Sequence, residues 1–303
     1  MNISFTKMHG LGNDFVLLTE DGLPSEWRDS LPLLAKTLCD RHFGIGADGL
    51  ILAARSHQPD CDIRFVYLNG DGSWAEMCGN GIRCFARYVL DRGLVKQPAF
   101  KAETLAGIIA SEVLADGQVR VDMGPPILEP AAIPFQFDFT EALPWVNVPL
   151  RANNQTIPAT PVSMGNPHCI VFQQDLAEPL EPAVWGPILE HHPAFPAKTN
   201  VEFVEVIDQH TVRVVVWERG CGFTLACGTG ACATAVAACL SNKTASRVAV
   251  HLPGGPLDIF WDRQGEQHVW MTGPASYVFE GVLALPEPEQ LTKSQKTSHV
   301  ALF

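Results

Sequence analysis

The feature that most restricts how this 303-residue chain can fold is an internal repeat. A shift of 149 positions places residues 78–81 (Cys-Gly-Asn-Gly) on residues 227–230 (Cys-Gly-Thr-Gly). The same shift, without a gap, also places 64–69 on 213–218 and 124–125 on 273–274. A repeat of this length corresponds to a whole domain. The sequence therefore predicts two domains related by pseudo-symmetry, each contributing one of the two cysteines, Cys78 and Cys227.

Each half of the repeat combines strands with one helix. Alternating apolar residues at 63–68 and 212–216 predict half-buried strands that lead toward the two cysteines. Helical spacing of apolar residues follows Cys78 as far as Gly93, and the run 231–240 is apolar on all sides, which predicts a buried central helix. Further strands are expected at 111–114, 119–123, 169–172, 201–206 and 248–252. The Pro-rich stretch 125–149 is expected to mark the crossing between the halves.

Composition excludes several classes of function. The formal net charge is −12 and there is no basic stripe, whereas nucleic acids and anionic membranes favour clustered Lys and Arg, so neither is expected as a partner. The first residues alternate like a strand and lack the apolar core of a signal peptide, and no window approaches a membrane span, so we expect a cytoplasmic protein. Nine irregularly spaced cysteines fit reduced, mostly buried thiols. No zinc pattern is present, and no metal is expected.

The two C-G-x-G turns suggest proton-transfer chemistry. A helix N-terminus presents unpaired N–H groups and a partial positive charge, so it binds anions and stabilises a thiolate, which should lower the pKa of a cysteine there. If a carbon is held between two such thiols, one can remove its proton while the other delivers a proton to the opposite face. The result is inversion of a stereocentre, with an adjacent carboxylate held by the helix N-termini. No electron-sink cofactor is strictly required.

Each motif taken alone also has an ordinary structural explanation. C-G-x-G is a common tight turn and a single buried cysteine usually only packs, but packing gives no reason to duplicate a cysteine at equivalent positions. Asn13 and Asn166 repeat a Gly-Asn pair at an offset of 153, for which a turn and a ligand contact are equally good explanations. Arg219 can bind a ligand carboxylate or simply be hydrated. His168 is favoured as a packed histidine over a metal ligand.

Five stretches together resemble the diaminopimelate epimerase family, and the resemblance covers nearly everything except the C-terminal tail. They are 7–15 (Lys-Met-His-Gly-Leu-Gly-Asn-Asp-Phe), 76–81 (Glu-Met-Cys-Gly-Asn-Gly), 163–168 (Ser-Met-Gly-Asn-Pro-His), 217–220 (Trp-Glu-Arg-Gly) and 226–230 (Ala-Cys-Gly-Thr-Gly). The resemblance implies a cofactor-independent isomerase that interconverts LL- and meso-2,6-diaminopimelate, in the biosynthesis of lysine and of bacterial cell-wall precursors.

The resemblance also implies roles for individual residues. Cys78 and Cys227 are the expected acid/base pair, and His168 and Glu218 are expected to tune them. The residues at the family's substrate-binding positions are Asn13, Asn69, Gly79, Asn80, Asn166, Asn200, Glu218, Arg219, Gly228 and Thr229. One departure is visible: after the Gly-x-Gly-x-Asp run some members carry Gln where this chain has Gly49, which puts one substrate contact in doubt.

The implied fold is α+β, with two pseudo-symmetric domains, each a mostly antiparallel sheet wrapped around a central helix, and the active site in the cleft between them. The expected N-terminal domain spans 1–122 and takes back a strand at about 275–285, the second domain spans 123–274, and 286–303 form a disordered tail. The partner is a small amino-acid substrate, and the family also suggests a homodimer.

Two other interpretations stay open. A relative of proline racemase could share this architecture and act on another small acid, although Arg219 and the set of asparagines favour a substrate with a second amino-acid head group. A redox protein could instead use Cys78 and Cys227 to form a reversible disulfide.

Overall fold

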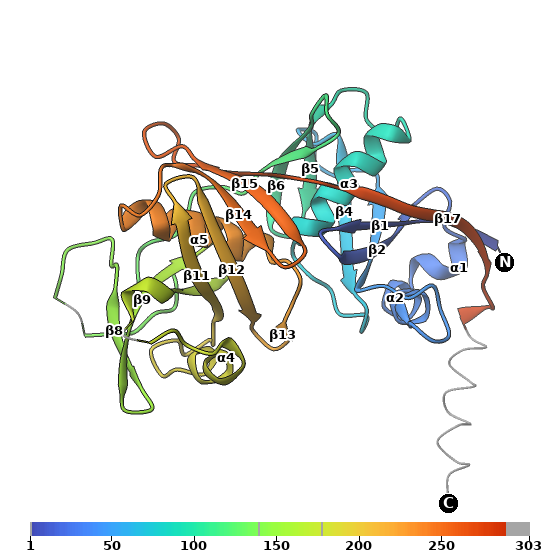
Figure 1. The fold of residues 1–303 in the computed structure, drawn as a ribbon. Coiled ribbons are helices and arrows are strands. Elements are labelled where there is room, and N and C mark those ends of the chain that lie inside the picture. The colour runs from blue at the N-terminus through green and yellow to red at the C-terminus, as the bar shows by residue number, and fades with distance from the viewer. Residues whose placement is uncertain (1, 139, 177, 289–303) are drawn as a thin grey trace, which may run out of the picture. The chain divides into compact units, whose positions relative to one another are not determined.

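The computed structural model describes residues 2–138, 140–176 and 178–288, and its ribbon is drawn in Figure 1. The chain divides into two compact units: unit 1 comprises residues 1–119 and 275–303, and unit 2 comprises residues 120–274. The chain therefore passes from unit 1 to unit 2 after Val119 and returns after Pro274. The tail expected at 286–303 lies, beyond Pro288, outside the described residues.

Unit 1 is a mixed, mostly antiparallel sheet. Its strands pair in the order β17-β1-β2-β3-β4-β5-β6, where β2–β3 and β4–β5 are parallel and the other pairs are antiparallel. Helix α3 packs against β1, β2, β3, β4 and β6. The strands are β1 (Asn2–Gly10), β2 (Asn13–Thr19), β3 (Gly49–Ala54), β4 (Ile63–Asn69), β5 (Ala99–Thr104), β6 (Gly107–Val113) and β17 (Ser276–Ala284), and the helices are α1 (Ser25–Arg28), α2 (Leu31–Cys39) and α3 (Gly79–Asp91).

Unit 2 has the same plan. Its strands pair in the order β8-β9-β10-β11-β12-β14-β15-β16-β7, and the parallel pairs are β10–β11 and β12–β14. The strands are β7 (Val119–Asp122), β8 (Val148–Ala152), β9 (Gln155–Ser163), β10 (Pro167–Phe172), β11 (Asn200–Asp208), β12 (Thr211–Glu218), β13 (Gly222–Phe223), β14 (Arg247–Leu252), β15 (Gly255–Trp261) and β16 (Val269–Gly273), and the helices are η1 (Gln173–Asp175), α4 (Pro182–Glu190) and α5 (Gly228–Leu240).

The repeat read from the sequence is a repeat of structure, and the α+β class is confirmed. Helix α3 begins at Gly79 and α5 at Gly228, so the 149-residue shift carries one helix onto the other from end to end. The order of parallel and antiparallel pairs is also the same from β1 to β6 as from β9 to β15. Each unit therefore places one cysteine-led helix against a sheet in the same way.

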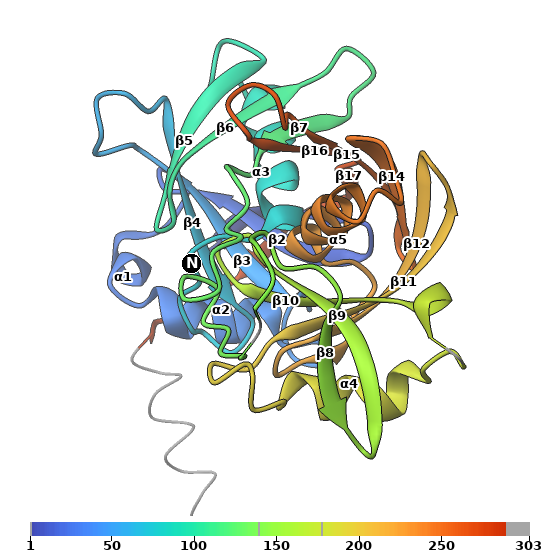
Figure 2. The same cartoon turned by 90° about the vertical axis from the view of Figure 1, so that its left-hand side faces the viewer.

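The two central helices differ in the polarity of the residues that they bury. In α5 every residue except Thr229 and Leu240 is buried, as the small and uniformly apolar side chains predict. Figure 2 shows α5 nearly end-on, with β14, β15 and β16 above it and β9 and β10 below it. The first ten residues of α3 include buried Asn80 and Arg83, and polar residues therefore line part of its packed side.

The Pro-rich stretch does not carry the crossing between the units, contrary to the sequence-based expectation. It lies within unit 2, where Ile133 is fully buried and Phe135 is 3% exposed in a core cluster with Phe195 and Phe203. Proline removes backbone N–H donors and so prevents regular strands, but it leaves the apolar side chains between the prolines free to pack. Ile133 and Phe135 therefore pack into the core of unit 2 from an irregular segment.

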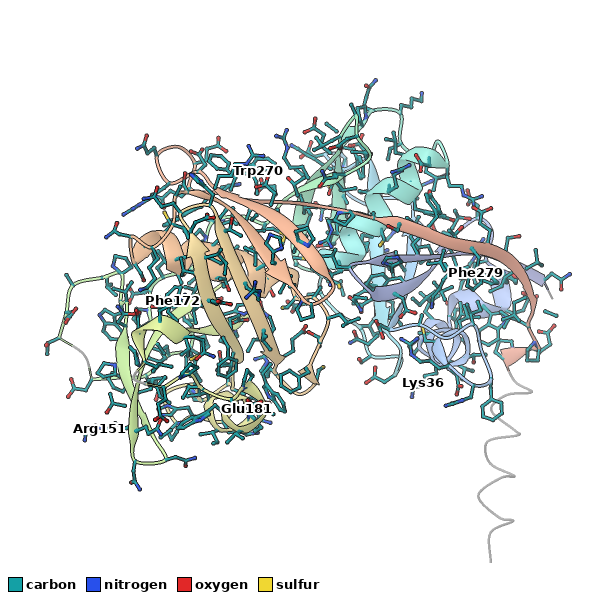
Figure 3. All side chains as sticks on the ribbon, in the orientation of Figure 1. Lys36, Arg151, Phe172, Glu181, Trp270 and Phe279 are labelled. Atoms are coloured by element: carbon teal, nitrogen blue, oxygen red, sulfur yellow. The ribbon has the colours of Figure 1, made fainter. Side chains whose placement is uncertain are left out.

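The C-terminal strand belongs to unit 1. Strand β17 pairs antiparallel with β1 from Ala284 opposite Asn2 to Ser276 opposite His9. Phe279 of β17, labelled in Figure 3, stands edge to face with Phe5 of β1 at 5.8 Å between ring centroids. Among the residues that the structure describes, no helix is long and apolar enough to span a membrane.

Candidate active site

Each catalytic candidate occupies the N-cap of its helix. Cys78 precedes α3 and Cys227 precedes α5, both with extended backbone angles. The first intrahelical bonds run from Ile82 N to the Cys78 carbonyl at 2.8 Å and from Ala231 N to the Cys227 carbonyl at 3.0 Å. The backbone N–H groups of residues 79–81 and 228–230 therefore lie ahead of the first helical bond, where a helix has no internal acceptor for them. Each cysteine stands beside a site suited to an anion.

The fourth residue of each C-G-x-G motif must be small, because its neighbours lie close to it. A Cβ added at Gly230 would lie 2.7 Å from Glu202 Oε1 and 3.3 Å from Cys227 Sγ. At the equivalent Gly81 a Cβ would lie 3.3 Å from Ile51 Cδ1 and 3.4 Å from Cys78 Cβ. Glycine is needed more strictly in unit 2, because there the close neighbour is a buried carboxylate.

In unit 1, Cys78 faces two asparagine side chains of fixed orientation. Its thiol donates to Asn13 Oδ1 at 3.7 Å, and Asn80 Nδ2 donates to the same oxygen at 3.3 Å. Buried Arg83 donates to Asn80 Oδ1 at 2.9 Å, and a guanidinium offers donors only, so the amide nitrogen of Asn80 must point to Asn13. The structure thus brings together three of the sequence-predicted residues, Asn13, Cys78 and Asn80.

A charged network supports Asn13 from the other side. Asp48 Oδ2 accepts from Asn13 Nδ2 at 2.6 Å, and Asp48 Oδ1 accepts from Arg41 at 2.7 Å. Arg41 also pairs with Asp14 at 2.8 Å, and buried Lys7 pairs with Asp14 at 2.7 Å. Burial tends to raise the pKa of Asp14, but the bonds from Arg41 and Lys7 outweigh it and lower that pKa to about 2. Asp48 therefore orients Asn13, and Arg41 links Asp48 to Asp14 and so to Lys7.

In unit 2, the surroundings of Cys227 oppose the thiolate. Burial raises the pKa of Cys227 well above its ordinary value, and the carboxylates of Glu218 and Glu202 raise it further. A hydrogen bond between Cys227 Sγ and Thr229 Oγ1 at 3.4 Å and another from Gly230 N at 3.4 Å offset these effects only in part. The expectation that the helix terminus makes this thiol acidic is therefore wrong for Cys227, because desolvation and two nearby carboxylates exceed the effect of the helix dipole.

Glu218 is the immediate partner of Cys227. The carboxyl group of Glu218 is hydrogen-bonded to the Cys227 thiol and accepts a short bond from Thr224 Oγ1. Burial raises the pKa of Glu218, and the charge of Glu202 raises it further. Two acids with raised pKa values in direct contact make an arrangement in which a proton can pass between sulfur and carboxylate.

His168 lies at the centre of a buried polar cluster and not in a purely packing role. Nδ1 of its fully buried ring is 2.7 Å from Glu202 Oε1, and Nε2 is 3.1 Å from Asn166 Oδ1. The charges of His168 and Glu202 both act on the pKa of Glu218. The cluster therefore connects Asn166 and His168 electrostatically to the Glu218–Cys227 pair.

Asn200 and Asn69 have structural bonds of their own. Asn200 is 4% exposed, and its side chain donates to the Pro167 carbonyl at 2.9 Å and accepts from Arg219 N at 2.9 Å. Arg219 itself is exposed, and its guanidinium donates to the Ala197 carbonyl at 3.0 Å. Asn69, at the end of β4, donates instead to Ser73 Oγ at 2.9 Å.

Position 49 is occupied by glycine for a steric reason in this chain. A Cβ at position 49 would lie 2.5 Å from Tyr67 Cε2 and 2.8 Å from the Leu68 carbonyl oxygen. The ring of Tyr67 therefore occupies the space into which a longer side chain, such as glutamine, would begin. The departure at this position is coupled to the presence of Tyr67 on the neighbouring strand β4.

Several residues of the site were not found from the sequence. Glu202 is fully buried within β11, but the equivalent residue of the first repeat is Ile51, which pairs with Tyr67 as Glu202 pairs with Val216, so the repeat gave no signal for a carboxylate there. Asp48 ends the Gly-x-Gly-x-Asp run, which was the one available hint. Within residues 2–138, 140–176 and 178–288, no three His, Cys, Asp or Glu side chains are grouped so that they could hold a metal ion.

Comparison with known proteins gives the same assignment across the chain. The family model described as diaminopimelate epimerase matches residues 5–129 and 160–278. A diaminopimelate epimerase of Desulfitobacterium hafniense is 50% identical over 286 residues, covering 93% of this chain and 98% of that protein. A diaminopimelate epimerase of Desulforudis audaxviator is 52% identical over 283 residues, covering 92% of this chain and 98% of that protein.

Solved structures extend the likeness to the fold. A probable proline racemase from Agrobacterium radiobacter has a TM-score of 0.68 at 17% identity, over 95% of this chain and 95% of that one. A PhzF-family phenazine biosynthesis protein from Bacillus anthracis has a TM-score of 0.65 at 17% identity, over 94% of this chain and all of that one. At such identities the likeness concerns the fold alone. With a matching family model and relatives at half identity over almost its whole length, the chain belongs to the diaminopimelate epimerase family.

Proposed function

We propose that this protein is an isomerase that interconverts LL- and meso-2,6-diaminopimelate, with Cys78 and Cys227 as the acid/base pair. The observation that supports this best is the repetition of one arrangement, a cysteine at the N-cap of the central helix of each unit, in a chain half identical to proteins named diaminopimelate epimerase. The substrate is a small amino acid that bears a carboxylate on the reacting carbon.

The proposed reaction moves one proton at each face of the α-carbon. One cysteine, as thiolate, takes the proton from the carbon and becomes a thiol. The electron pair left on the carbon is stabilised through the adjacent carboxylate, which the N–H groups of Gly79, Asn80, Gly228 and Thr229 would bind. The other cysteine, as thiol, gives its proton to the opposite face and becomes a thiolate. The stereocentre is inverted and no net proton is consumed.

Glu218 is the proposed proton acceptor for Cys227. Because the pKa of this thiol is raised well above its ordinary value, it does not ionise near neutral pH by release of a proton to water. The carboxyl group of Glu218 is bonded to the thiol, and because its pKa is raised it is a better acceptor for the proton than an ordinary carboxylate. We propose that His168 adjusts this exchange through Glu202 and that Asn13 holds Cys78 on the other half.

The remaining sequence-predicted residues are proposed to bind the polar groups of the substrate. Exposed Arg219 offers a guanidinium suited to a second carboxylate, and the bond from its guanidinium to the Ala197 carbonyl leaves further N–H groups for a ligand. The proposed binding set is Asn13, Asn69, Asn166, Asn200 and Arg219.

The decisive experiment follows isotope exchange in deuterated water. The purified protein, after chelator treatment and without pyridoxal phosphate, is incubated with LL-diaminopimelate, and deuterium at the α-carbons is measured by mass spectrometry. We expect deuterium at one α-carbon together with formation of the meso isomer. Cys78→Ala and Cys227→Ala should each remove net epimerisation while retaining the circular dichroism of the wild type, and the control Cys61→Ala should retain activity. Turnover in either of the first two variants would refute the two-cysteine scheme.

Further properties are proposed from the family and the composition. We propose a cytoplasmic protein, two hinged domains that correspond to units 1 and 2, and a homodimer, which sedimentation would detect at about twice the chain mass. For the redox alternative, activity is compared after air oxidation with and without dithiothreitol. If oxidation abolishes the epimerase activity and the reductant restores it, the two thiols can both catalyse the reaction and form a reversible disulfide.

A further inference from the structure

A residue outside the recognised motifs holds the turn that carries Glu218 and Arg219. Glu190, the last residue of α4, is 4% exposed, and its two oxygens accept from different donors. Oε2 accepts from Trp217 Nε1 at 2.8 Å, and Oε1 accepts from the backbone N of Gly220 at 3.0 Å. These donors come immediately before Glu218 and immediately after Arg219. One buried carboxylate therefore accepts hydrogen bonds from the residues on both sides of Glu218 and Arg219.

The same helix also seats the ring of Trp217. Gly186 lies one turn before Glu190 on α4, and a Cβ at this glycine would be 2.5 Å from two atoms of the indole. Phe223 stands edge to face with the indole, with ring centroids 5.1 Å apart. The indole therefore has one position, in which its N–H points at Glu190.

The backbone donors of the turn are all satisfied. The N–H of Arg219 donates to Asn200 Oδ1 at 2.9 Å, that of Gly220 to Glu190 Oε1 at 3.0 Å, and that of Cys221 to the Glu218 carbonyl at 3.0 Å. Gly220 has φ of 78°, a conformation that glycine adopts without strain. Removal of one acceptor would leave a donor without its partner and allow the turn other conformations.

We propose that Glu190 is a positioning residue, which sets the Glu218 carboxylate against Cys227 by fixing the conformation of residues 217–220. Only a carboxylate suits the position, because both of its oxygens accept, whereas a glutamine would turn an NH₂ group toward one of the two donors. Burial tends to raise the pKa of Glu190, but the bonds from Trp217 and Gly220 outweigh it and lower that pKa. The charged groups around Cys227 are Glu218 and Glu202, with His168 beside them. The effect of Glu190 on turnover rests on the proposed function, whereas its effect on Cys227 does not.

The first test needs no substrate. The rate of alkylation of Cys227 by iodoacetamide is measured by peptide mass spectrometry in the wild type, Glu190→Gln, Glu218→Gln and the double variant. Since the charge of Glu218 raises the pKa of Cys227, both single variants should alkylate faster, by about threefold or more, as expected for loss of a hydrogen bond to a charged group. In the Glu218→Gln background, Glu190→Gln should change nothing further. An equal acceleration in both backgrounds would overturn the proposal, because Glu190 would then act on Cys227 without Glu218.

A matched control separates positioning from general loss of stability. Asp122 in unit 2 also accepts from one side-chain ring, His268 Nδ1 at 2.8 Å, and one backbone donor, Gly124 N at 2.9 Å. Asp122→Asn should lower the melting temperature as Glu190→Gln does, but it should leave Cys227 alkylation unchanged. If both variants change the alkylation rate alike, the effect of Glu190 is only structural and the proposal fails.

The second test measures turnover of LL-diaminopimelate. Glu190→Gln should lower kcat/KM by about tenfold, with both a higher KM from displaced Arg219 and a lower kcat from displaced Glu218. If the wild type shows no turnover, the proposed function fails while the alkylation result still decides the role of Glu190. Should Glu190→Gln not fold, Trp217→Phe replaces the indole by a smaller ring without an N–H donor, and it should accelerate Cys227 alkylation in the same direction; an unchanged rate there would count against the proposal.

Discussion

At Cys227, the helix N-terminus and burial act in opposite directions on the pKa of the thiol. A helix N-terminus contributes on the order of 0.3–1 kcal/mol in favour of an anion at an exposed site. Burial can shift a pKa by up to about 3–5 units in the opposite direction. In this site the thiol is buried and lies near two carboxylates, so the neutral form prevails. The helix N-terminus is then available mainly for the substrate carboxylate, and the proton of the thiol is controlled by Glu218.

The first prediction concerns the pH dependence of Cys227. Glu218→Gln removes a charge that raises the pKa of Cys227, so this pKa should fall, although burial keeps it above the ordinary value. The onset of alkylation should therefore move to lower pH, which peptide mass spectrometry across pH 7–11 measures. Glu205→Gln, a control at an exposed position of β11 where Glu205 pairs with Arg213, should leave the onset in place. An onset that stays fixed in Glu218→Gln would show that the carboxylate does not act on the sulfur.

Residues were predictable where the sequence repeated them. Cys78 and Cys227 were singled out as candidates because the same residue occurs at equivalent positions, and Asn13, Asn80 and Asn166 because they stand in recognised motifs. Glu190, Glu202 and Asp48 were not predicted, because each acts through a neighbour that only the folded chain brings near. A single carboxylate in a strand or at a helix end resembles an ordinary surface residue until its burial is known.

At the scale of elements, the two central helices occupy equivalent positions but differ in whether their first turn can accept a larger side chain. Both Gly81 and Gly230 are the fourth residue of a C-G-x-G motif and face their own N-cap cysteine. In a helix interior alanine is more favourable than glycine by about 0.8–1 kcal/mol, so a methyl group stabilises the helix wherever it fits. In α3 it meets the flexible end of Ile51, whereas in α5 it meets the carboxylate of fully buried Glu202.

The second prediction follows from this difference. Gly230→Ala should destabilise the protein by about 1–3 kcal/mol and displace Glu202, because overpacking near a buried carboxylate has no easy relief. Gly81→Ala should stay within about 1 kcal/mol of the wild type, since propensity offsets a tight contact at a side-chain end. Urea unfolding of the two variants measures both values. Equal destabilisation of the two would contradict the argument from the close contacts.

Element boundaries could be predicted where periodicity was strong. The cysteine-led helices and the strands before them were found because apolar spacing changes sharply at each cysteine. The segment around Ile133 and Phe135 was assigned to a linker, since prolines disguise its apolar side chains. Prolines predict that a segment lacks regular backbone hydrogen bonds, but they do not predict whether the neighbouring side chains are buried.

At the scale of the whole molecule, unit 2 is inserted into unit 1. Residues 120–274 form unit 2 as one continuous segment, while unit 1 is completed by β17 after the chain returns. The repeat in the sequence predicted two similar units, because its blocks are long and without gaps. It gave weaker information on the crossing, since β7 begins at Val119 and continues into unit 2 without any break in its strand pattern.

The third prediction tests the dependence of unit 1 on its last strand. Deletion of residues 275–303 removes the antiparallel partner of β1 along its whole length, so β1 and β2 should lose protection against hydrogen exchange. Strands β11 and β12 of unit 2 should keep theirs, because their pairing involves no residue after Pro274. Deletion of residues 289–303 retains every pairing of β17 and serves as the control. Equal loss of protection in both units would refute their separate stability.

The return of β17 to β1 has a consequence for synthesis on the ribosome. All of unit 2 emerges before the strand that completes unit 1, so the later half of the repeat can reach its native state first. The β1 edge meanwhile presents unpaired N–H and C=O groups until residues 276–284 have emerged. During that interval the nascent polypeptide is open to pairing with another chain, and the emergence of β17 ends it.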